Sequence, residues 1–178
     1  MRRIIFHVDV NSAFLSWEAV YRLRHLGGTL DLRTIPSAVG GDQEKRHGII
    51  LAKSIPAKKY KVQTGEPIVD ARAKCPQLML VPPNYELYQR SSKAMIRILS
   101  EYADQIEKYS IDEAFLDMTG ICQEPKETAE KLKEQIFREL GFTVNVGISS
   151  NKLLAKMASD FEKPDRVHTL WPEEIPKK

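Results

Sequence analysis

Two acidic residues interrupt an otherwise apolar stretch in the segment KYSIDEAFLDM, residues 108–118. Neighbouring side chains on an ideal strand point to opposite faces, so Asp112 and Glu113 can share a site only where the chain turns or bulges. We therefore predict two short strands, Lys108–Ile111 and Ala114–Met118, with the acidic pair at or near the bend between them. An unpaired carboxylate in apolar surroundings costs free energy, which makes the pair a candidate functional feature.

A third acidic residue, Asp9, lies near the end of another expected strand, IIFHVDV at residues 4–10. The alternation places Ile5, His7 and Asp9 on one face of this strand and the apolar residues Ile4, Phe6, Val8 and Val10 on the other. An Asp that closes a strand is often only a turn former, and structural acids also occur inside sheets. From the residues alone, metal binding and a structural role both remain open.

The other elements predicted from the sequence are helices separated by short strands. A helix capped by Ser12 is expected to run to about Leu26, with Leu15, Ala19, Leu23 and Leu26 buried and Gly27-Gly28 as its end. Residues 35–39 and 48–52 suggest strands and residues 68–74 a short helix, and together they form an inserted lobe. The later pattern predicts a long amphipathic helix from Tyr88 through Met95, Leu99 and Tyr102 to Ile106, a helix at 125–140, a half-buried strand at 142–148 and a helix at about 151–161.

Without the inserted lobe, the first six elements follow the order strand, helix, strand, strand, helix, strand. This βαββαβ order is ferredoxin-like, so the predicted fold class is α+β, with a ferredoxin-like core and a small inserted α/β lobe. The first and third strands of such a core lie side by side at its centre. We therefore expect Asp9 to lie close to Asp112 and Glu113, although about a hundred residues separate them in the sequence.

The composition is that of a globular protein with one well-buried core or two small lobes, because 42% of the 178 residues are hydrophobic. Residues 1–83 carry 13 Lys or Arg against 7 Asp or Glu, and residues 84–178 carry 14 against 17. A basic front half suits contact with a polyanion, although basic surfaces are often only solvated. No stretch is apolar enough to be a membrane span or a secretory signal, so we expect a cytoplasmic protein. Cys75 and Cys122 are expected to be reduced thiols without a chemical role.

The acidic residues suit a particular chemistry if they converge. Magnesium prefers oxygen ligands, and its usual site combines two or three carboxylates with water and substrate phosphates. Three carboxylates can hold two such ions, which then stabilise both the attacking and the leaving oxygen of a phosphoryl transfer. Asp9, Asp112 and Glu113 are therefore candidate ligands of two divalent metal ions.

Four segments together resemble a known family. They are DVNSAFLS at 9–16, KVQTGEPIVDARAKCPQLMLVPPNYELY at 61–88, YSIDEAFLDMTG at 109–120 and VGISSNKLLAKMASDFEKP at 146–164. In this order they resemble the Y-family translesion DNA polymerases, nearest the UmuC and DinB branches. A chance match of all four segments is far less credible than a chance match of one.

The resemblance implies a role for several residues of the chain. Asp9, Asp112 and Glu113 correspond to the metal-binding carboxylates, with the main-chain carbonyl of Val10 as a further ligand and two Mg²⁺ ions, replaceable by Mn²⁺, as cofactors. Phe14 corresponds to the aromatic steric gate that excludes ribonucleotides, although without the motif it would be interpreted as a core Phe. Asn11 and Lys163 are implied at the nucleotide, Lys163 at its triphosphate, whereas Ser149, Asn151 and Lys152 are expected to be structural.

The resemblance also implies a domain organisation and partners. Residues 1–12 and 84–172 would form the palm, residues 13–83 the fingers, and residues 173–178 the start of a linker to a thumb and a little finger that the chain lacks. The expected partners are primer-template DNA and dNTP, with a sliding clamp or other replication and repair proteins contacted through the missing parts, and no membrane. We accordingly expect part of a longer damage-tolerant polymerase, with weak or no activity on its own.

The inserted lobe departs from the usual pattern of the family. Many members have a Tyr and, three residues later, an Arg that grip the triphosphate, whereas this chain has Ile55 and Lys58. Lysine supplies charge without the planar fork of arginine, and isoleucine donates no hydrogen bond. Ser54 or Lys53 are candidate replacements. The basic run of Lys53, Lys58, Lys59 and Lys61 suits either phosphate contact or a solvated surface.

Two other functions are compatible with the sequence. A nucleotidyl cyclase also places acids at the edge of a ferredoxin-like sheet, and GGDQE at residues 40–44 resembles the GGDEF motif of diguanylate cyclases. This motif lies in the inserted lobe, without the flanking strands that a cyclase requires. A non-catalytic module that binds DNA or a partner protein is the second alternative, but it has no need of the three carboxylates.

Overall fold

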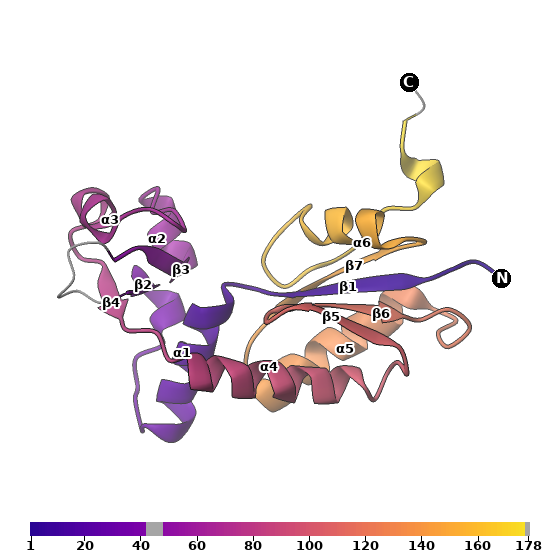
Figure 1. Cartoon of the computed structure of the whole chain (residues 1–178), viewed down its shortest axis with the longest axis horizontal. Coiled ribbons are helices and arrows are strands. Elements are labelled where there is room, and N and C mark those ends of the chain that lie inside the picture. Colours follow the sequence, from indigo (N-terminus) through magenta and orange to yellow (C-terminus); the bar gives the residue numbers. More distant parts are fainter. Residues whose placement is uncertain (42–47, 177–178) are drawn as a thin grey trace. The chain divides into compact units, whose positions relative to one another are not determined.

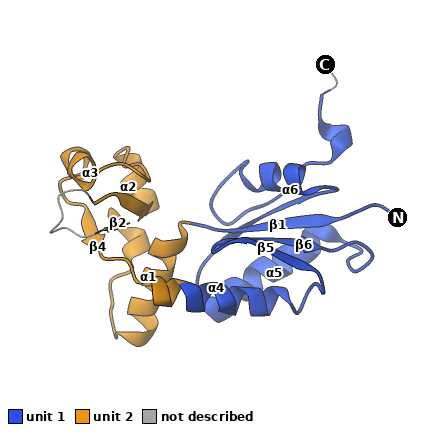
Figure 2. Cartoon of the chain, in the orientation of Figure 1, with its two compact units in different colours: residues 1–11, 89–178 blue, residues 12–88 orange. Residues whose placement is uncertain are grey.

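The computed structural model of the protein describes residues 1–41 and 48–176. It confirms a mixed α+β fold. The chain divides into two compact units, which Figure 2 shows in different colours: unit 1 comprises residues 1–11 and 89–178, and unit 2 comprises residues 12–88. Each unit is built around its own sheet.

The sheet of unit 1 has five strands in the order β5-β6-β1-β7-β8. The strands are β1 (Ile5–Val10), β5 (Ile106–Ser110), β6 (Glu113–Asp117), β7 (Val144–Ser149) and β8 (Val167–Thr169). The first and third sheet-forming strands, β1 and β6, pair antiparallel at the centre, as the ferredoxin-like order predicts. Strand β8 pairs parallel to β7 at the edge and was not expected from the sequence.

Three helices cover this sheet: α4 (Tyr85–Leu99), α5 (Pro125–Leu140) and α6 (Lys152–Ser159). Figure 1 shows α6 on one side of the sheet and α4 and α5 on the other. Helix α5 has the expected bounds, with Pro125 in its first turn and Gly141 in the left-handed conformation at φ 85° after its end. Helix α4 ends at Leu99, so the prediction of a helix reaching Ile106 was wrong, because that residue opens β5.

Strand β7 is buried on both faces rather than half-buried as predicted. Its polar positions, which the alternation assigned to solvent, lie under α6. Gly147 permits this close approach, because a Cβ atom there would lie 1.8 Å from the main-chain oxygen of Ala155 and 2.5 Å from the nitrogen of Ser159. Helix α6 therefore rests directly on the backbone of the strand.

In its described residues, unit 2 has a three-stranded sheet in the order β3-β2-β4, three α-helices and a 3-10 helix at Leu32–Thr34. The strands are β2 (Ser37–Gly40), β3 (Ile50–Lys53) and β4 (Met79–Val81), and the helices are α1 (Ala13–His25), α2 (Ile55–Lys59) and α3 (Ile68–Lys74). Helix α3 has the predicted bounds, whereas α2 and β4 were missed. In α1, Leu15 and Ala19 are buried as predicted, but Leu26 is 60% exposed because the helix has ended before it.

Within the described residues, no helix is both long and apolar enough to cross a membrane. Of the GGDQE motif, Gly40 ends β2 and Gly41 follows it, and the remaining three residues lie outside the described part of the chain.

Candidate functional site

The candidate carboxylates lie where the central strands of unit 1 meet the turn between β5 and β6. Asp9 and Glu113 are direct partners in the antiparallel register of β1 and β6, so their side chains project from the same face. Asp112 lies in the turn immediately before β6, and its main-chain oxygen accepts a hydrogen bond from the nitrogen of Val10 at 3.0 Å. The sequence thus placed the acidic pair correctly at a bend, and the fold brings it to the end of β1.

The hydroxyl of Ser110 links the two acids of the turn. Its Oγ lies 2.9 Å from Asp112 Oδ1 and 3.0 Å from Glu113 Oε2. A register shift between Lys108 and Ser110 allows β5 to bulge here, and Ser110 becomes the partner of Glu113. The bulge therefore turns a polar group toward both carboxylates.

Two lysines form ion pairs with the acidic cluster. Lys163 Nζ lies 2.5 Å from Asp9 Oδ2 and 3.0 Å from Asp160 Oδ1, and Lys156 Nζ lies 3.3 Å from Glu113 Oε1. Among the described residues, no three His, Cys, Asp or Glu side chains are gathered closely enough to hold a metal ion as they stand. In this conformation Asp9 and Glu113 are each paired with a lysine ammonium group instead.

The carboxylates differ in their electrostatic state. Burial, together with the charges of Asp112 and Glu113, raises the pKa of Asp9 to about 6, although the hydrogen bond and the charge of Lys163 act in the opposite direction. Burial also opposes ionisation of Glu113, but hydrogen bonds from Ser110 and Lys156 outweigh it and lower its pKa. The donor set fits a divalent cation, because it combines hard oxygens with a concentration of negative charge that a cation would relieve.

The side chain of Asn11 lies in a buried polar network. Its Nδ2 donates to Asn145 Oδ1 at 3.1 Å, and its Oδ1 accepts from Thr143 Oγ1 and from the main-chain nitrogen of Asp165. Asn145 in turn donates to the main-chain oxygens of Ser159 and Glu162. The network ties down the loop that carries Lys163, so Asn11 lies against this loop, and its direct contact with a nucleotide stays a prediction.

Phe14 belongs to an aromatic cluster in unit 2. Its ring stacks on Tyr88 with a centroid distance of 4.3 Å and an interplanar angle of 12°, and it contacts Trp17 and Tyr85 at centroid distances of 6.1 and 6.0 Å. Tyr88 is fully buried and donates its hydroxyl hydrogen to Glu18. Phe14 is half-buried, so part of its ring stays accessible.

The basic residues of the inserted lobe lie around the short helix α2. Lys58 is exposed, and burial together with the charge of Lys58 lowers the pKa of Lys53. Ser54 is buried and caps α2, since its Oγ accepts from the nitrogens of Ala57 and Ser37 and donates to the oxygen of Ile35. Its hydroxyl is thus used within the lobe, which leaves Lys53 as the better candidate replacement for the missing tyrosine.

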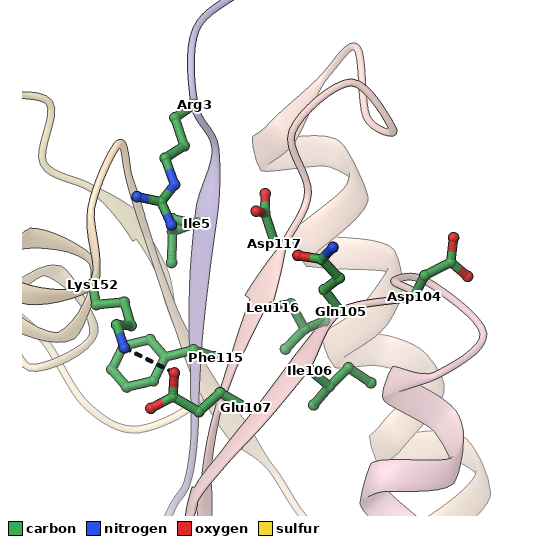
Figure 3. Close-up of a pocket in the computed structure, with 10 residues that line it drawn as sticks. All are labelled: Arg3, Ile5, Asp104, Gln105, Ile106, Glu107, Phe115, Leu116, Asp117 and Lys152. Atoms are coloured by element: carbon green, nitrogen blue, oxygen red, sulfur yellow. Dashed lines mark hydrogen bonds and ion pairs between the residues drawn. The ribbon is translucent and has the colours of Figure 1, made fainter.

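A hollow of about 390 Å³ opens over β1, β5 and β6 (Figure 3). It extends to Ile5 and Asp117, which pair at the other end of β1 and β6 from Asp9 and Glu113. Phe115, two residues beyond Glu113 on β6, lines it together with Ile5. An ion pair of 2.8 Å joins Lys152 and Glu107, as the dashed line in Figure 3 shows. Cationic and anionic residues both line the hollow, so it has no clear preference for the charge of a ligand.

Sequence reasoning missed several residues that contact the candidate site. His7, Lys156 and Asn145 all belong to this group, as does Tyr88 behind Phe14. His7 carried one usable signal, because it shares a strand face with Asp9. Asn145 lies on β7 and is the register partner of Asp9. Lys156 and Tyr88 reach their positions through the packing of α6 and α4, which periodicity does not specify.

Comparisons with known proteins agree with this geometry. The chain matches the impB/mucB/samB family over residues 8–160. It is 53% identical to DNA polymerase IV of Clostridium acetobutylicum over 180 residues, covering 100% of this chain and 45% of that protein, and 40% identical to DNA polymerase IV 1 of Bacillus subtilis, covering 98% and 41%. The chain therefore spans less than half the length of these curated relatives.

Comparison with solved structures agrees with the comparison of sequences. DinB from Sulfolobus solfataricus superposes with a TM-score of 0.82 at 30% identity, covering 96% of this chain and 49% of that one. An insertion ternary complex of Dbh DNA polymerase superposes with a TM-score of 0.83 at 31% identity and similar coverage. The resemblance expected from the four sequence segments is confirmed: this chain belongs to the impB/mucB/samB family, whose structural neighbours are Y-family DNA polymerases.

Proposed function

We propose that this chain is the palm and fingers part of a template-directed DNA polymerase that transfers dNMP from dNTP to a primer 3′-hydroxyl and tolerates damaged template. The observation that carries the proposal is the cross-strand pair of Asp9 and Glu113 with Asp112 in the adjoining turn. Relatives named DNA polymerase IV support it. Unit 1 would supply the palm and unit 2 the fingers, and both would act in the cytoplasm, where bacterial DNA lies.

The three carboxylates, with the main-chain carbonyl of Val10, would hold two Mg²⁺ ions. When bound, such ions stabilise the attacking and leaving oxygens of an in-line phosphoryl transfer. Lys163 pairs with Asp9 in this structure, and a cation bound at Asp9 would release its ammonium group. The freed lysine would then contact the triphosphate. The carboxylate of Asp160 beside it favours this role, because a nearby negative charge keeps the lysine protonated.

Unit 2 would contribute the sugar and phosphate contacts of the incoming nucleotide. The stacked ring of Phe14 would exclude a 2′-hydroxyl. Lys53 and Lys58 would supply positive charge for the triphosphate in place of the Tyr and Arg of other family members. Two flexible ammonium groups bind phosphate as point charges, so this grip should be less directional than that of an arginine fork.

The decisive experiment joins this chain to the C-terminal remainder of the Clostridium acetobutylicum relative and measures Mg²⁺-dependent primer extension. Asp112→Ala should reduce the rate by at least about 100-fold, because it removes a metal ligand. Asp104→Ala is the matched control, since Asp104 is an exposed carboxylate outside the cluster. Undiminished extension by the Asp112 variant would overturn the proposal, and product from GTP alone would support a cyclase instead.

A further inference from the structure

A buried chain of hydrogen bonds lies behind Glu113 in unit 1. His7 is 1% exposed, and its two ring nitrogens face different partners. Nε2 lies 3.1 Å from Glu113 Oε1, and Nδ1 lies 2.7 Å from the hydroxyl oxygen of Ser159. The histidine thus connects a carboxylate on β6 with the last residue of α6.

The direction of these hydrogen bonds follows from the partners. The Ser159 hydroxyl also lies 2.7 Å from the main-chain oxygen of Lys156, and its single hydrogen can serve only one acceptor. If that hydrogen went to Lys156, a neutral His7 would donate from Nδ1 and turn a bare lone pair of Nε2 toward the Glu113 carboxylate. The favourable arrangement is the other one, in which Ser159 donates to Nδ1 and Nε2–H donates to Glu113.

The position of the histidine ring is fixed on every side. Its neighbours in the sheet are Phe115 on β6 and Gly147 on β7. The Phe115 ring packs against it at a centroid distance of 4.8 Å. The absence of a side chain at Gly147 lets α6 rest on the strand, which brings the Ser159 hydroxyl within reach. The ring therefore has little freedom to follow a moving carboxylate.

Glu113 Oε1 receives two donors of opposite character. Lys156 carries an ammonium group and its side chain is 38% exposed, whereas the ring of His7 is buried and held in place by Phe115 and Ser159. A mobile ammonium competes with a metal cation for the same oxygen. The imidazole N–H does not carry a mobile charge to this oxygen, and as a fixed donor it holds the carboxylate that it contacts in one orientation.

We propose that His7, held by Ser159, is a positioning residue that sets the Glu113 carboxylate for metal binding, while Lys156 opposes metal binding at the same oxygen. Its hydrogen bond to Oε1 leaves Oε2, held by Ser110, turned toward Asp112. This inference rests on the proposed function, because it presupposes that Glu113 is a metal ligand.

The test measures Mn²⁺ binding to this chain without nucleotide, from the electron paramagnetic resonance signal of free Mn²⁺. His7→Phe keeps the ring and removes both hydrogen bonds, and it should weaken binding by about 10-fold or more. His7→Gln retains a donor at the position of Nε2 and should stay within about 3-fold of wild type. Lys156→Met should strengthen binding, the opposite sign from His7→Phe, although both variants remove a donor to the same oxygen.

A serine pair supplies the matched control. Ser159→Ala removes the hydroxyl that orients His7 and should weaken Mn²⁺ binding, whereas Ser92→Ala should not. Ser92 is equally buried, and its hydroxyl has no hydrogen-bond partner in the described part of the chain. If His7→Phe fails to fold, the comparison of Ser159→Ala with Ser92→Ala still tests the positioning role of His7.

The outcomes separate the two proposals. Wild-type affinity in His7→Phe and Ser159→Ala overturns the positioning role, as does equal weakening by His7→Phe and His7→Gln, which a purely structural role would produce. Asp112→Ala tests the metal site itself. If it binds Mn²⁺ as wild type does, the proposed function and this inference both fail, whereas loss of binding there combined with unchanged His7 variants overturns the positioning role alone.

Discussion

Asp9 and Glu113 face each other across the antiparallel pair of β1 and β6, and each pairs with a different lysine. Like charges directly opposite on a sheet are destabilising unless a cation compensates them. Lys163 and Lys156 supply that compensation here, from the loop after α6 and from α6 itself. The same two carboxylates that need a counter-charge for stability are those that would need a metal for activity.

Asp9→Asn should stabilise the chain at neutral pH. Burial raises the pKa of Asp9 to about 6 from an unfolded value of 3.8, so the folded state binds the proton more tightly. Stability that the protonated form provides is present below pH 4 and is lost as the pH rises to about 6. A neutral amide avoids this loss, which corresponds to about 1–3 kcal/mol in the free energy of unfolding.

Urea unfolding in EDTA, from pH 4 to pH 8, checks this prediction. The difference between Asp9→Asn and wild type should grow between pH 4 and pH 6 and then level off. Asp160→Asn is the control, because this exposed carboxylate also pairs with Lys163. A difference that does not change with pH would contradict the assigned cause, and a less stable Asp9 variant at pH 7.5 would contradict its sign.

Much of this fold follows from local sequence. Proline at the start and glycine at the end set the bounds of α5, and apolar alternation located β1 and β7. The apolar spacing of α4 continued beyond Leu99 to Ile106, yet the helix stops, because the same residues also suit the turn and strand that follow. Strands β4 and β8 have three residues each, too few for a periodic signal.

The candidate site was predictable only in part. Acids in strand sequence and the βαββαβ order placed Asp9 beside Glu113. The bulge at Ser110 and the contact between His7 and Ser159 were not predictable, because they depend on a register shift and on how closely α6 approaches the sheet. His7 and Ser159 are 152 positions apart in the sequence, and they come into contact because Gly147 lets α6 lie close to the sheet. The hydrophobic periodicity of the sequence does not reveal this role of Gly147.

Gly147→Ala should destabilise unit 1 strongly. The new Cβ would lie 1.8 Å from the main-chain oxygen of Ala155 and 2.5 Å from the nitrogen of Ser159, so α6 must move away from β7. Overpacking of this kind costs about 1–3 kcal/mol or more. Gly65→Ala is the control: nothing lies within 4 Å of its Cβ position, and only its φ of 89° opposes the change. Thermal unfolding compares the two, and equal losses would contradict the close approach of α6.

Lys163→Met should have opposite effects on metal and nucleotide. The variant removes the ammonium group that lies 2.5 Å from Asp9 Oδ2, so Mn²⁺ should bind this chain more tightly in the absence of nucleotide. In the polymerase completed with the relative's C-terminal part, the KM for dNTP should rise about 10-fold, because a charged contact to the triphosphate is lost. Lys133→Met is the control, since Lys133 pairs with Asp165 in the same loop. Weaker Mn²⁺ binding by Lys163→Met would show that the lysine supports the metal site rather than competing for it.

Phe14→Ala should relax the sugar selectivity of the completed polymerase. The ring is held by stacking on Tyr88 at 4.3 Å, and part of it remains accessible, as a group that contacts a substrate must be. Removing it would leave space for a 2′-hydroxyl, so the ratio of kcat/KM for dNTP to that for rNTP should fall by at least about 10-fold, equivalent to 1.4 kcal/mol. Tyr85→Ala removes another ring of the same cluster, in contact with Phe14 edge to face, and should alter the ratio far less. Single-nucleotide insertion with matched dNTP and rNTP measures both variants, and an unchanged ratio in Phe14→Ala would return Phe14 to the role of a packing residue.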